Sequence, residues 1–165
     1  FGNTYEGVKD ITSKVRKVLN KPLIIKLTPN VTNIAEIAKA AEDAGADGVS
    51  LINTLLAMKI DINKRKPVLA NNTGGLSGPA IKPVAVRMVY QVAQAVNIPI
   101  LGMGGIVNGD DAIEFILAGA SAISIGAGNF IKPTTCLDVI SGIEEYMEKY
   151  DIQNISDLVG KVEMN

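Results

Sequence analysis

Four short apolar runs, each followed by a helical pattern, restrict what this chain can fold into. The runs are Pro22–Leu27, Asp47–Asn53, Ile98–Met103 and Ala122–Ile125. Each is short and nearly continuously apolar, as expected for a parallel strand covered on both faces. Helical patterns lie around them, at Thr4–Leu19, Asn33–Ala44, Ile81–Val96, Asp110–Ala118 and Leu137–Tyr150. This alternation predicts an α/β fold with a parallel sheet.

The number of these units predicts part of a barrel. A complete (β/α)8 TIM barrel has eight strands and about 250 residues, whereas this chain has 165. We therefore predict one domain over residues 1–165 that forms the C-terminal half of such a barrel, with about four parallel strands. The alternative is a complete, open, doubly wound domain. Because the first residue is Phe1 and not Met, we expect the chain to begin inside a longer protein.

The gap between the second and third strands is longer than the other gaps. Its extra segment, Leu55–Pro79, lacks a helical pattern. The apolar stretches Met58–Ile62 and Pro67–Ala70 flank the polar Asn63–Lys66, which favours a small hairpin insertion over another strand–helix unit. Long loops after strands usually carry function.

Composition excludes several classes of site. The chain has no histidine, which rules out histidine acid–base chemistry, a Ser-His-Asp triad and the usual zinc sites. The net charge of −1, with acids and bases interspersed, is unlike that of a nucleic-acid-binding surface. The single cysteine, Cys136, allows no internal disulfide, which favours a reducing compartment. We expect Cys136 to be a small buried residue.

Two glycine turns follow consecutive strands and predict a phosphate site. Gly104-Gly105 follows the third strand, and Gly126-Ala127 follows the fourth. Without a β-carbon the backbone can approach phosphate oxygens closely, and its N–H groups can point at them. The loops after the last two strands of a barrel commonly form one such site. The alternative is that these glycines only make tight turns.

Three polar residues at strand ends are further candidates. Lys26 lies in an otherwise apolar strand, so it needs an anionic partner if it is buried, or else it reaches solvent from an edge strand. Asn53 and Thr54 end the second strand, where they can bind a flat polar heterocycle or merely close a turn. The glycine-rich loop that contains Gly78 can approach a ligand with bare backbone. We expect Lys82, which follows it, to lie at the surface.

Five strings of residues together resemble one known family. They are Lys26–Asn30, Leu51–Thr54, Thr73–Pro83, Ile100–Ile106 and Ala118–Ala122. In content and order they are similar to dihydroorotate dehydrogenase, and the likeness runs from about Phe1 to the C-terminus. Ser77 and Met88–Val92 look most like the NAD-linked, cytoplasmic branch of class 1.

The resemblance implies an enzyme and the roles of its residues. The reaction would be FMN-dependent oxidation of dihydroorotate to orotate in pyrimidine biosynthesis, an oxidoreductase reaction on a CH–CH bond. Lys26 would contact the FMN ring, and Asn53 and Thr54 would bind the substrate. Other positions would line the flavin or hold its phosphate: Ile52, Gly78, Gly104, Gly105, Gly126 and Ala127. The family often has threonine in place of Ala127, so a hydroxyl contact is lost while the backbone donor remains.

The resemblance also implies parts that this chain lacks. The catalytic cysteine base of the family would lie upstream of Phe1, so we expect no catalytic residue here and no activity from the fragment alone. The complete enzyme would form a homodimer and pair with an FAD and [2Fe–2S] electron-transfer subunit. No metal is implied in this chain itself. Two alternatives remain open: the FMN barrel of a dihydropyrimidine dehydrogenase, and a half-barrel that binds phosphate or flavin without catalysis.

Overall fold

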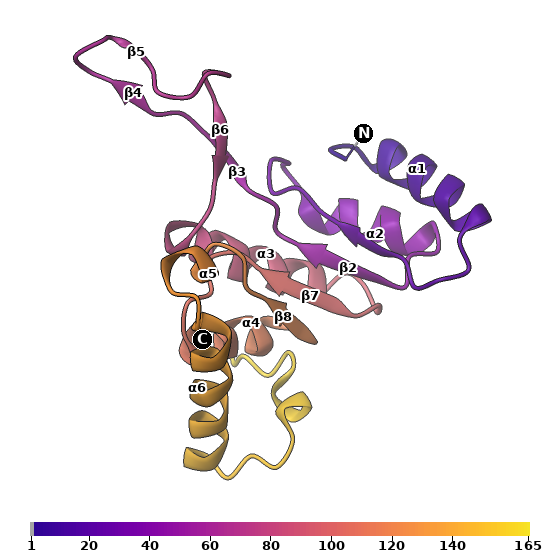
Figure 1. Ribbon diagram of the computed structural model, residues 1–165. Helices are drawn as coiled ribbons and strands as arrows, with labels where there is room; N and C mark the ends of the chain where they lie inside the picture. The colour runs from indigo at the N-terminus through magenta and orange to yellow at the C-terminus, as the bar shows by residue number, and fades with distance from the viewer. Residues whose placement is uncertain (1) are drawn as a thin grey trace.

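A computed structural model describes residues 2–165 and shows a four-stranded parallel sheet backed by helices (Figure 1). The strands are β1 (Ile24–Lys26), β2 (Gly48–Leu51), β7 (Ile100–Met103) and β8 (Ala122–Ser124). They lie side by side in the order β1-β2-β7-β8, and all neighbours are parallel. The predicted α/β half-barrel is thus confirmed as a fold.

The strand order excludes the doubly wound alternative. In a doubly wound sheet the order of strands reverses at a switch point and helices cover both faces. Here the order along the sheet is the order along the chain. Ile24 and Lys26 of β1 and Ala122 of β8 are exposed, whereas Ile25 and Ile123 are half-buried, so the edge strands are open on one face, the bare face of the sheet. A parallel sheet whose strands follow chain order and whose inner face is uncovered has the geometry of an opened barrel.

Side-chain caps explain where the helices begin. Before α1 (Tyr5–Val18), Thr4 accepts a hydrogen bond from a backbone N–H of the first turn. Asn33 caps α2 (Ile34–Asp43) in the same way, and Asn108 caps α4 (Gly109–Ala118). Such caps satisfy N–H groups that have no partner within the helix. All three helices agree with the predicted ranges to within one residue at each end.

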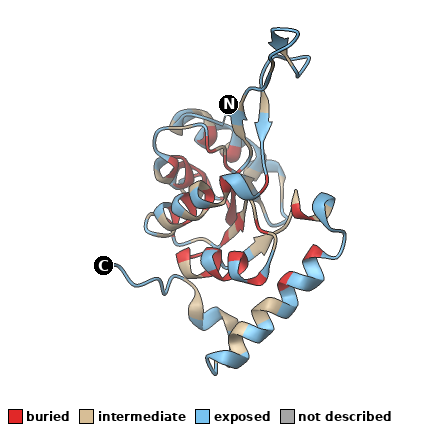
Figure 2. Cartoon of the chain, turned by 90° about the vertical axis from the view of Figure 1, so that its left-hand side faces the viewer, coloured by how far each residue is buried: buried red, intermediate tan, exposed pale blue. Residues whose placement is uncertain are grey.

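The remaining helices are α3 (Lys82–Ala93), α5 (Gly128–Ile131) and α6 (Thr135–Lys149), with short 3₁₀ turns η1 (Pro79–Ile81) and η2 (Ile155–Leu158). Helix α3 is confirmed, and α6 starts slightly earlier than predicted. Helix α5 was not predicted, and it is only a single turn. Figure 2 shows the buried residues gathered between the sheet and the helices behind it, while α6 extends away and is mostly exposed.

The core consists of aliphatic and small side chains. Val49 and Leu51 on β2 and Val89 and Val92 on α3 are completely buried. Phe115 on α4 is also inaccessible, and it fills space beside Gly102, where any β-carbon would lie 2.7 Å from its ring. The core therefore lies on the helical side of the sheet, and it holds the strand ends in place from behind.

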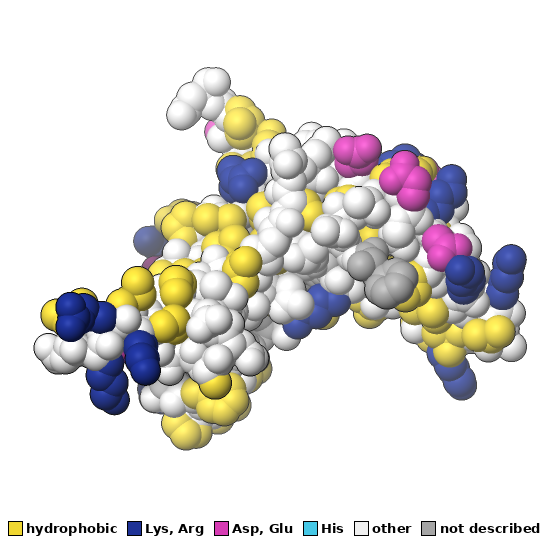
Figure 3. All heavy atoms as spheres, turned by 90° about the horizontal axis from the view of Figure 1, so that it is seen from above, with side chains coloured by type: hydrophobic (Ala, Val, Ile, Leu, Met, Phe, Trp, Pro, Cys, Tyr) yellow, Lys and Arg dark blue, Asp and Glu magenta, His cyan; other side chains and the backbone are white. Residues whose placement is uncertain are grey.

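A long hairpin leaves the body after β2 (Figure 1). Its base is β3 (Leu55–Ala57) paired with β6 (Gly74–Leu76), and its outer part is β4 (Ile60–Asp61) paired with β5 (Lys66–Pro67). The predicted hairpin is confirmed around its turn, with shorter strands, but the pairing at its base was missed. Figure 3 shows basic side chains at the end of this hairpin.

The exposure of Cys136 differs from the prediction, whereas that of Lys82 agrees with it. Cys136 is exposed on the first turn of α6, where its Sγ lies 3.3 Å from Asn129 Oδ1, so the expected burial was wrong. Only one face of α6 packs against the body, and Cys136 is on the other. Lys82 lies near the surface as expected, but its side chain is 22% exposed and paired.

Within residues 2–165, no helix combines the length and the apolar character that a membrane crossing requires.

Asp47 ties α1 to the start of the sheet and gives a pH-dependent test of this fold. Its Oδ2 accepts hydrogen bonds from Leu23 N at 2.7 Å and from Arg16 at 2.8 Å. The backbone bond from Leu23, followed by the Arg16 guanidinium, lowers the pKa of Asp47 below its usual 3.8. The folded state therefore favours the ionised form, and this stabilisation is lost as the pH falls through the lowered pKa.

We expect Asp47→Asn to lower the midpoint of thermal unfolding at pH 7. The difference from the unchanged chain should shrink as the pH falls below 3.8. Asp10→Asn, which removes an exposed ion pair within α1, is the control and should have a smaller effect. An Asp47→Asn deficit that stays constant down to pH 2 would contradict this role of the carboxylate.

Candidate functional site

All nine residues singled out from the sequence line one cleft at the carboxyl ends of the parallel strands. The cleft has a volume of about 190 Å³. Its walls come from β1, from the segments after β2, β7 and β8, and from the loop before η1. The nine are Lys26, Ile52, Asn53, Thr54, Gly78, Gly104, Gly105, Gly126 and Ala127. Parallel pairing brings them together, because it places every strand end at the same edge of the sheet.

Gly104 and Gly105 adopt backbone conformations that other residues rarely take. Their φ angles are +129° and +84°. A β-carbon on Gly105 would also lie 2.7 Å from Gly78 O, so the two loops touch through bare backbone. These glycines thus have a structural reason to be glycine, whatever else they do.

Gly126, unlike Gly104 and Gly105, is not required to be glycine by its backbone conformation or its packing. Its φ lies outside the left-handed range, and no described atom beyond its chain neighbours lies within 4 Å of the position of an added β-carbon. Packing and backbone strain therefore leave this position open to any residue. A glycine that faces an open cleft at a strand end is suited to close approach by a ligand.

Lys26 ends β1, which is an edge strand of the described sheet. Its side chain is exposed on the bare face of the sheet and borders the cleft. Within the described residues Lys26 is thus exposed on an edge strand and not buried, and its contact with an anionic ligand stays a prediction. No ion pair within residues 2–165 involves Lys26, so its charge is available to a ligand in the cleft.

Backbone hydrogen bonds hold the segment after β2 in register. Ile52 N donates to Met103 O at 2.9 Å, and Asn53 N donates to Leu27 O at 3.0 Å. Asn53 Oδ1 accepts from Thr54 N at 2.8 Å, a contact to the next residue that is not an Asx turn. The amide nitrogen of the Asn53 side chain is not used by this bond, so it can still contact a ligand.

Asn30 fastens this segment from the neighbouring strand. Its Nδ2 donates to Thr54 O at 3.0 Å, while its Oδ1 accepts from Leu56 N at 2.9 Å. A β-carbon on Gly75, in the hairpin strand opposite, would collide with Thr54 Oγ1 at 2.3 Å. Asn30 and Gly75 therefore set the position of Thr54 from both sides.

Four further residues line the cleft and were missed as site residues: Ser77, Ile81, Met103 and Ser124. Met103 and Ser124 are register partners at the ends of β7 and β8. They share the bare face with Lys26 by strand alternation, and this signal was present in the sequence. Ser77 adjoins Gly78. Ile81 enters the cleft only because η1 turns the chain there.

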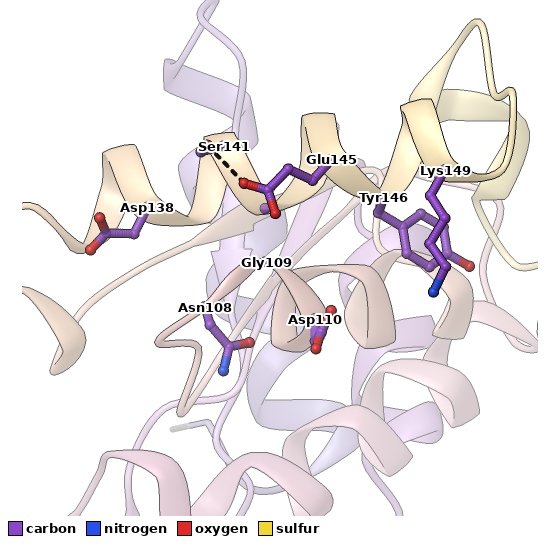
Figure 4. Close-up of a pocket in the computed structure, with 9 residues that line it drawn as sticks. Asn108, Gly109, Asp110, Asp138, Ser141, Glu145, Tyr146 and Lys149 are labelled. Carbon is purple, nitrogen blue, oxygen red and sulfur yellow. Dashed lines mark hydrogen bonds between the residues drawn. The ribbon is translucent and has the colours of Figure 1, made fainter.

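A wider hollow of about 530 Å³ lies between the start of α4 and one face of α6 (Figure 4). Its side chains include Asp110, Asp138, Glu145 and Lys149, and they are exposed. In Figure 4, Glu145 bonds to Ser141 of its own helix rather than pointing at a common centre. The hollow is an open groove beside the close crossing of Gly109 and Gly142, so we do not regard it as the functional site.

Comparison with known proteins agrees with the geometry. The family model described as dihydroorotate dehydrogenase matches residues 1–147. The chain belongs to this family. The dihydroorotate dehydrogenase resemblance seen in the sequence is therefore confirmed.

Individual relatives carry the same family name. The chain is 61% identical to dihydroorotate dehydrogenase B (NAD(+)), catalytic subunit, of Alkaliphilus metalliredigens, over 98% of this chain and 54% of that protein. It is 59% identical to the protein of the same name from Alkaliphilus oremlandii, with the same coverage. The protein from Brachyspira hyodysenteriae is 61% identical over 97% of this chain and 53% of its own length. The chain thus spans about half the length of these dihydroorotate dehydrogenases.

Gly126 supplies the sharpest test of the cleft as a binding site. We expect Gly126→Val to change the free energy of unfolding without ligand by no more than about 0.5 kcal/mol, because no protein atom opposes the new side chain. It should weaken FMN binding about tenfold or more, equal to at least about 1.4 kcal/mol, by filling the cleft.

Fluorescence titration with FMN and thermal unfolding measure the two effects separately. The control is Gly2→Val, at a glycine that also has open space around it but lies outside the cleft. Equal FMN affinities for the Gly126 and Gly2 variants would show that the ligand does not approach Gly126.

Proposed function

We propose that residues 1–165 are a partial TIM-barrel domain that binds FMN and serves FMN-dependent oxidation of dihydroorotate to orotate. The observation that carries the proposal is the meeting of all nine expected residues in one cleft, at the strand ends where barrel enzymes have their active sites. Family membership supports it. We also propose that this reaction belongs to pyrimidine biosynthesis and takes place in the cytoplasm.

The shape and chemistry of the cleft fit FMN. The lining includes bare backbone at Gly105 and Gly126, where amide groups can reach a phosphate. It also includes the apolar Ile52, which lies next to Gly104, and the side chain of Lys26. A flavin nucleotide has the matching form, with an anionic tail and a flat ring. The described cleft, at about 190 Å³, provides one wall for such a ligand.

Lys26 and the pair Asn53-Thr54 have distinct parts in this proposal. Bound FMN would supply a two-electron acceptor for a hydride. Lys26 would stabilise negative charge at the ring, since its ammonium group borders the cleft and has no ion pair within residues 2–165. The Asn53 amide and the Thr54 hydroxyl orient the substrate by donating to and accepting from its polar edge.

The proton that leaves dihydroorotate needs a base, and no Asp, Glu, Cys or Tyr among the described residues lines the cleft. Cys136 is the only cysteine in the sequence, and it lies outside the cleft, where its thiol donates a hydrogen bond to Asn129 Oδ1. The proposed base is a cysteine in a preceding segment of the complete enzyme. A homodimer and an FAD and [2Fe–2S] subunit that passes electrons to NAD are proposed for that enzyme as well.

A second candidate is a half-barrel that binds flavin or phosphate without turnover. The absence of a base from the described cleft favours it for these 165 residues taken alone. The names of the relatives favour dihydroorotate over the substrate of a dihydropyrimidine dehydrogenase.

Turnover assays separate the two candidates. The chain as its gene encodes it and a chain limited to residues 1–165 are each supplied with FMN and dihydroorotate, and orotate formation is followed by absorbance. We expect both to bind FMN and the short chain to form no orotate. Turnover by the 165 residues at the rate of a complete family member would disprove the need for an external base.

Lys26→Ala should weaken FMN binding or lower the reduction potential of the bound flavin, because the reduced ring loses a stabilising positive charge. Lys21→Ala is the matched control, since Lys21 is exposed and precedes the same strand but does not border the cleft. Flavin titration and a redox titration provide the readouts. If Lys26→Ala and Lys21→Ala agree in both, Lys26 has no role at the ring.

A further inference from the structure

We propose that Lys82 and Asp111 are positioning residues that hold the two glycine loops of the cleft together for FMN. Neither residue lines the cleft. The inference rests on the proposed function for its ligand, but the loop contact itself is a property of the protein without flavin.

The two loops touch each other where they line the cleft. One runs through Ser77 and Gly78 into η1 and α3, and the other runs from Gly104 to Asn108 and into α4. A β-carbon on Gly105 would lie 2.7 Å from Gly78 O and 3.0 Å from Lys82 Cβ. Small displacements of either loop would therefore move the backbone that faces the ligand.

An ion pair spans the junction. Lys82 Nζ, on the first residue of α3, lies 2.6 Å from Asp111 Oδ1 and 2.5 Å from Glu114 Oε1, both on α4. The Asp111 side chain is only 8% exposed. Hydrogen bonds to Asp111 and then Glu114 raise the pKa of Lys82, so the lysine stays charged at physiological pH.

Asp111 also fixes the glycine loop itself. Its Oδ2 accepts from Val107 N at 2.9 Å, and its own N–H donates to the Asn108 cap at 2.8 Å. The same carboxylate thus holds the backbone two residues after Gly105 and the lysine that follows Gly78. A buried carboxylate with both oxygens engaged is costly to disturb from either side.

Lys39 offers a contrast within the same molecule. It also pairs with two acids, Glu42 at 3.1 Å and Asp43 at 2.5 Å, but all three are on α2. Replacing Lys39 alone removes only contacts within α2, and Lys39 does not line the cleft. Lys82 differs in joining two separate elements, and this difference sets up a matched comparison.

The test compares Lys82→Met, Lys82→Arg and Lys39→Met in the chain as its gene encodes it. FMN affinity is measured by fluorescence titration, and amide hydrogen exchange of residues 104–108 is measured without flavin. We expect Lys82→Met to weaken FMN binding about five- to tenfold, a factor of ten being about 1.4 kcal/mol. Lys82→Arg should restore most of the affinity, and Lys39→Met should leave it unchanged.

Hydrogen exchange keeps this inference separate from the proposed function. Faster exchange at Val107 in Lys82→Met, but not in Lys39→Met, supports the positioning role whether or not the unchanged chain binds FMN. Failure of the unchanged chain to bind FMN would overturn the proposed function instead. If exchange over residues 104–108 is the same in both variants, or if the unchanged chain binds FMN and the affinities of the two variants agree within twofold, the positioning role is wrong. If Lys82→Met does not fold, Lys82→Arg and Asp111→Asn are compared by the same criteria.

Discussion

Parallel pairing of β1, β2, β7 and β8 decides where every candidate residue of this chain lies. Successive registers, such as Lys26 with Ser50 and Met103 with Ser124, bring the carboxyl ends of the strands to one edge. The segments that leave those ends then surround a common space. A shift of one residue in any strand would turn its inward side chains to the opposite face. The cleft depends on this register more than on any single side chain.

Glycine allows the loops at that edge to come close to one another and to leave backbone exposed. Gly105 lets one loop touch Gly78 O, and Gly126 leaves open space where another residue would place a side chain. The charges around the cleft are arranged in two ways. Among the described residues Lys26 has no ion pair and borders the cleft, whereas Lys82 lies outside the cleft and is paired with Asp111 and Glu114. The first arrangement suits contact with a ligand, and the second suits support of the loops.

Much of this arrangement could be predicted from the sequence, because short apolar runs and side-chain caps are local signals. The caps Asn33 and Asn108 begin helices where the pattern indicated. Pairing at the hairpin base could not be predicted, since Gly74 and Gly75 have low β-propensity and their partners lie nearly twenty residues away. The exposure of Cys136 depends on which face of α6 meets the body, and that is decided by tertiary packing.

In the candidate site, too, local signals could be predicted from the sequence, whereas contacts set by tertiary packing could not. Most of the nine residues were found because strand ends and glycine turns are visible in the sequence, whereas Ile52 and the ligand came from the resemblance to dihydroorotate dehydrogenase. The link between Lys82 and Asp111 was not visible, because it joins residues from two units that meet only after folding. Side chains that support a site from behind carry little sequence signal unless a partner is known.

A crystal structure of the chain with FMN tests the central claim most directly. The account predicts the FMN phosphate within hydrogen-bonding distance of backbone N–H groups at Gly105 and Ala127, with the ring between Ile52 and the Lys26 ammonium. An FMN bound in the groove between α4 and α6, or a phosphate held only by side chains away from Gly105 and Ala127, would contradict it.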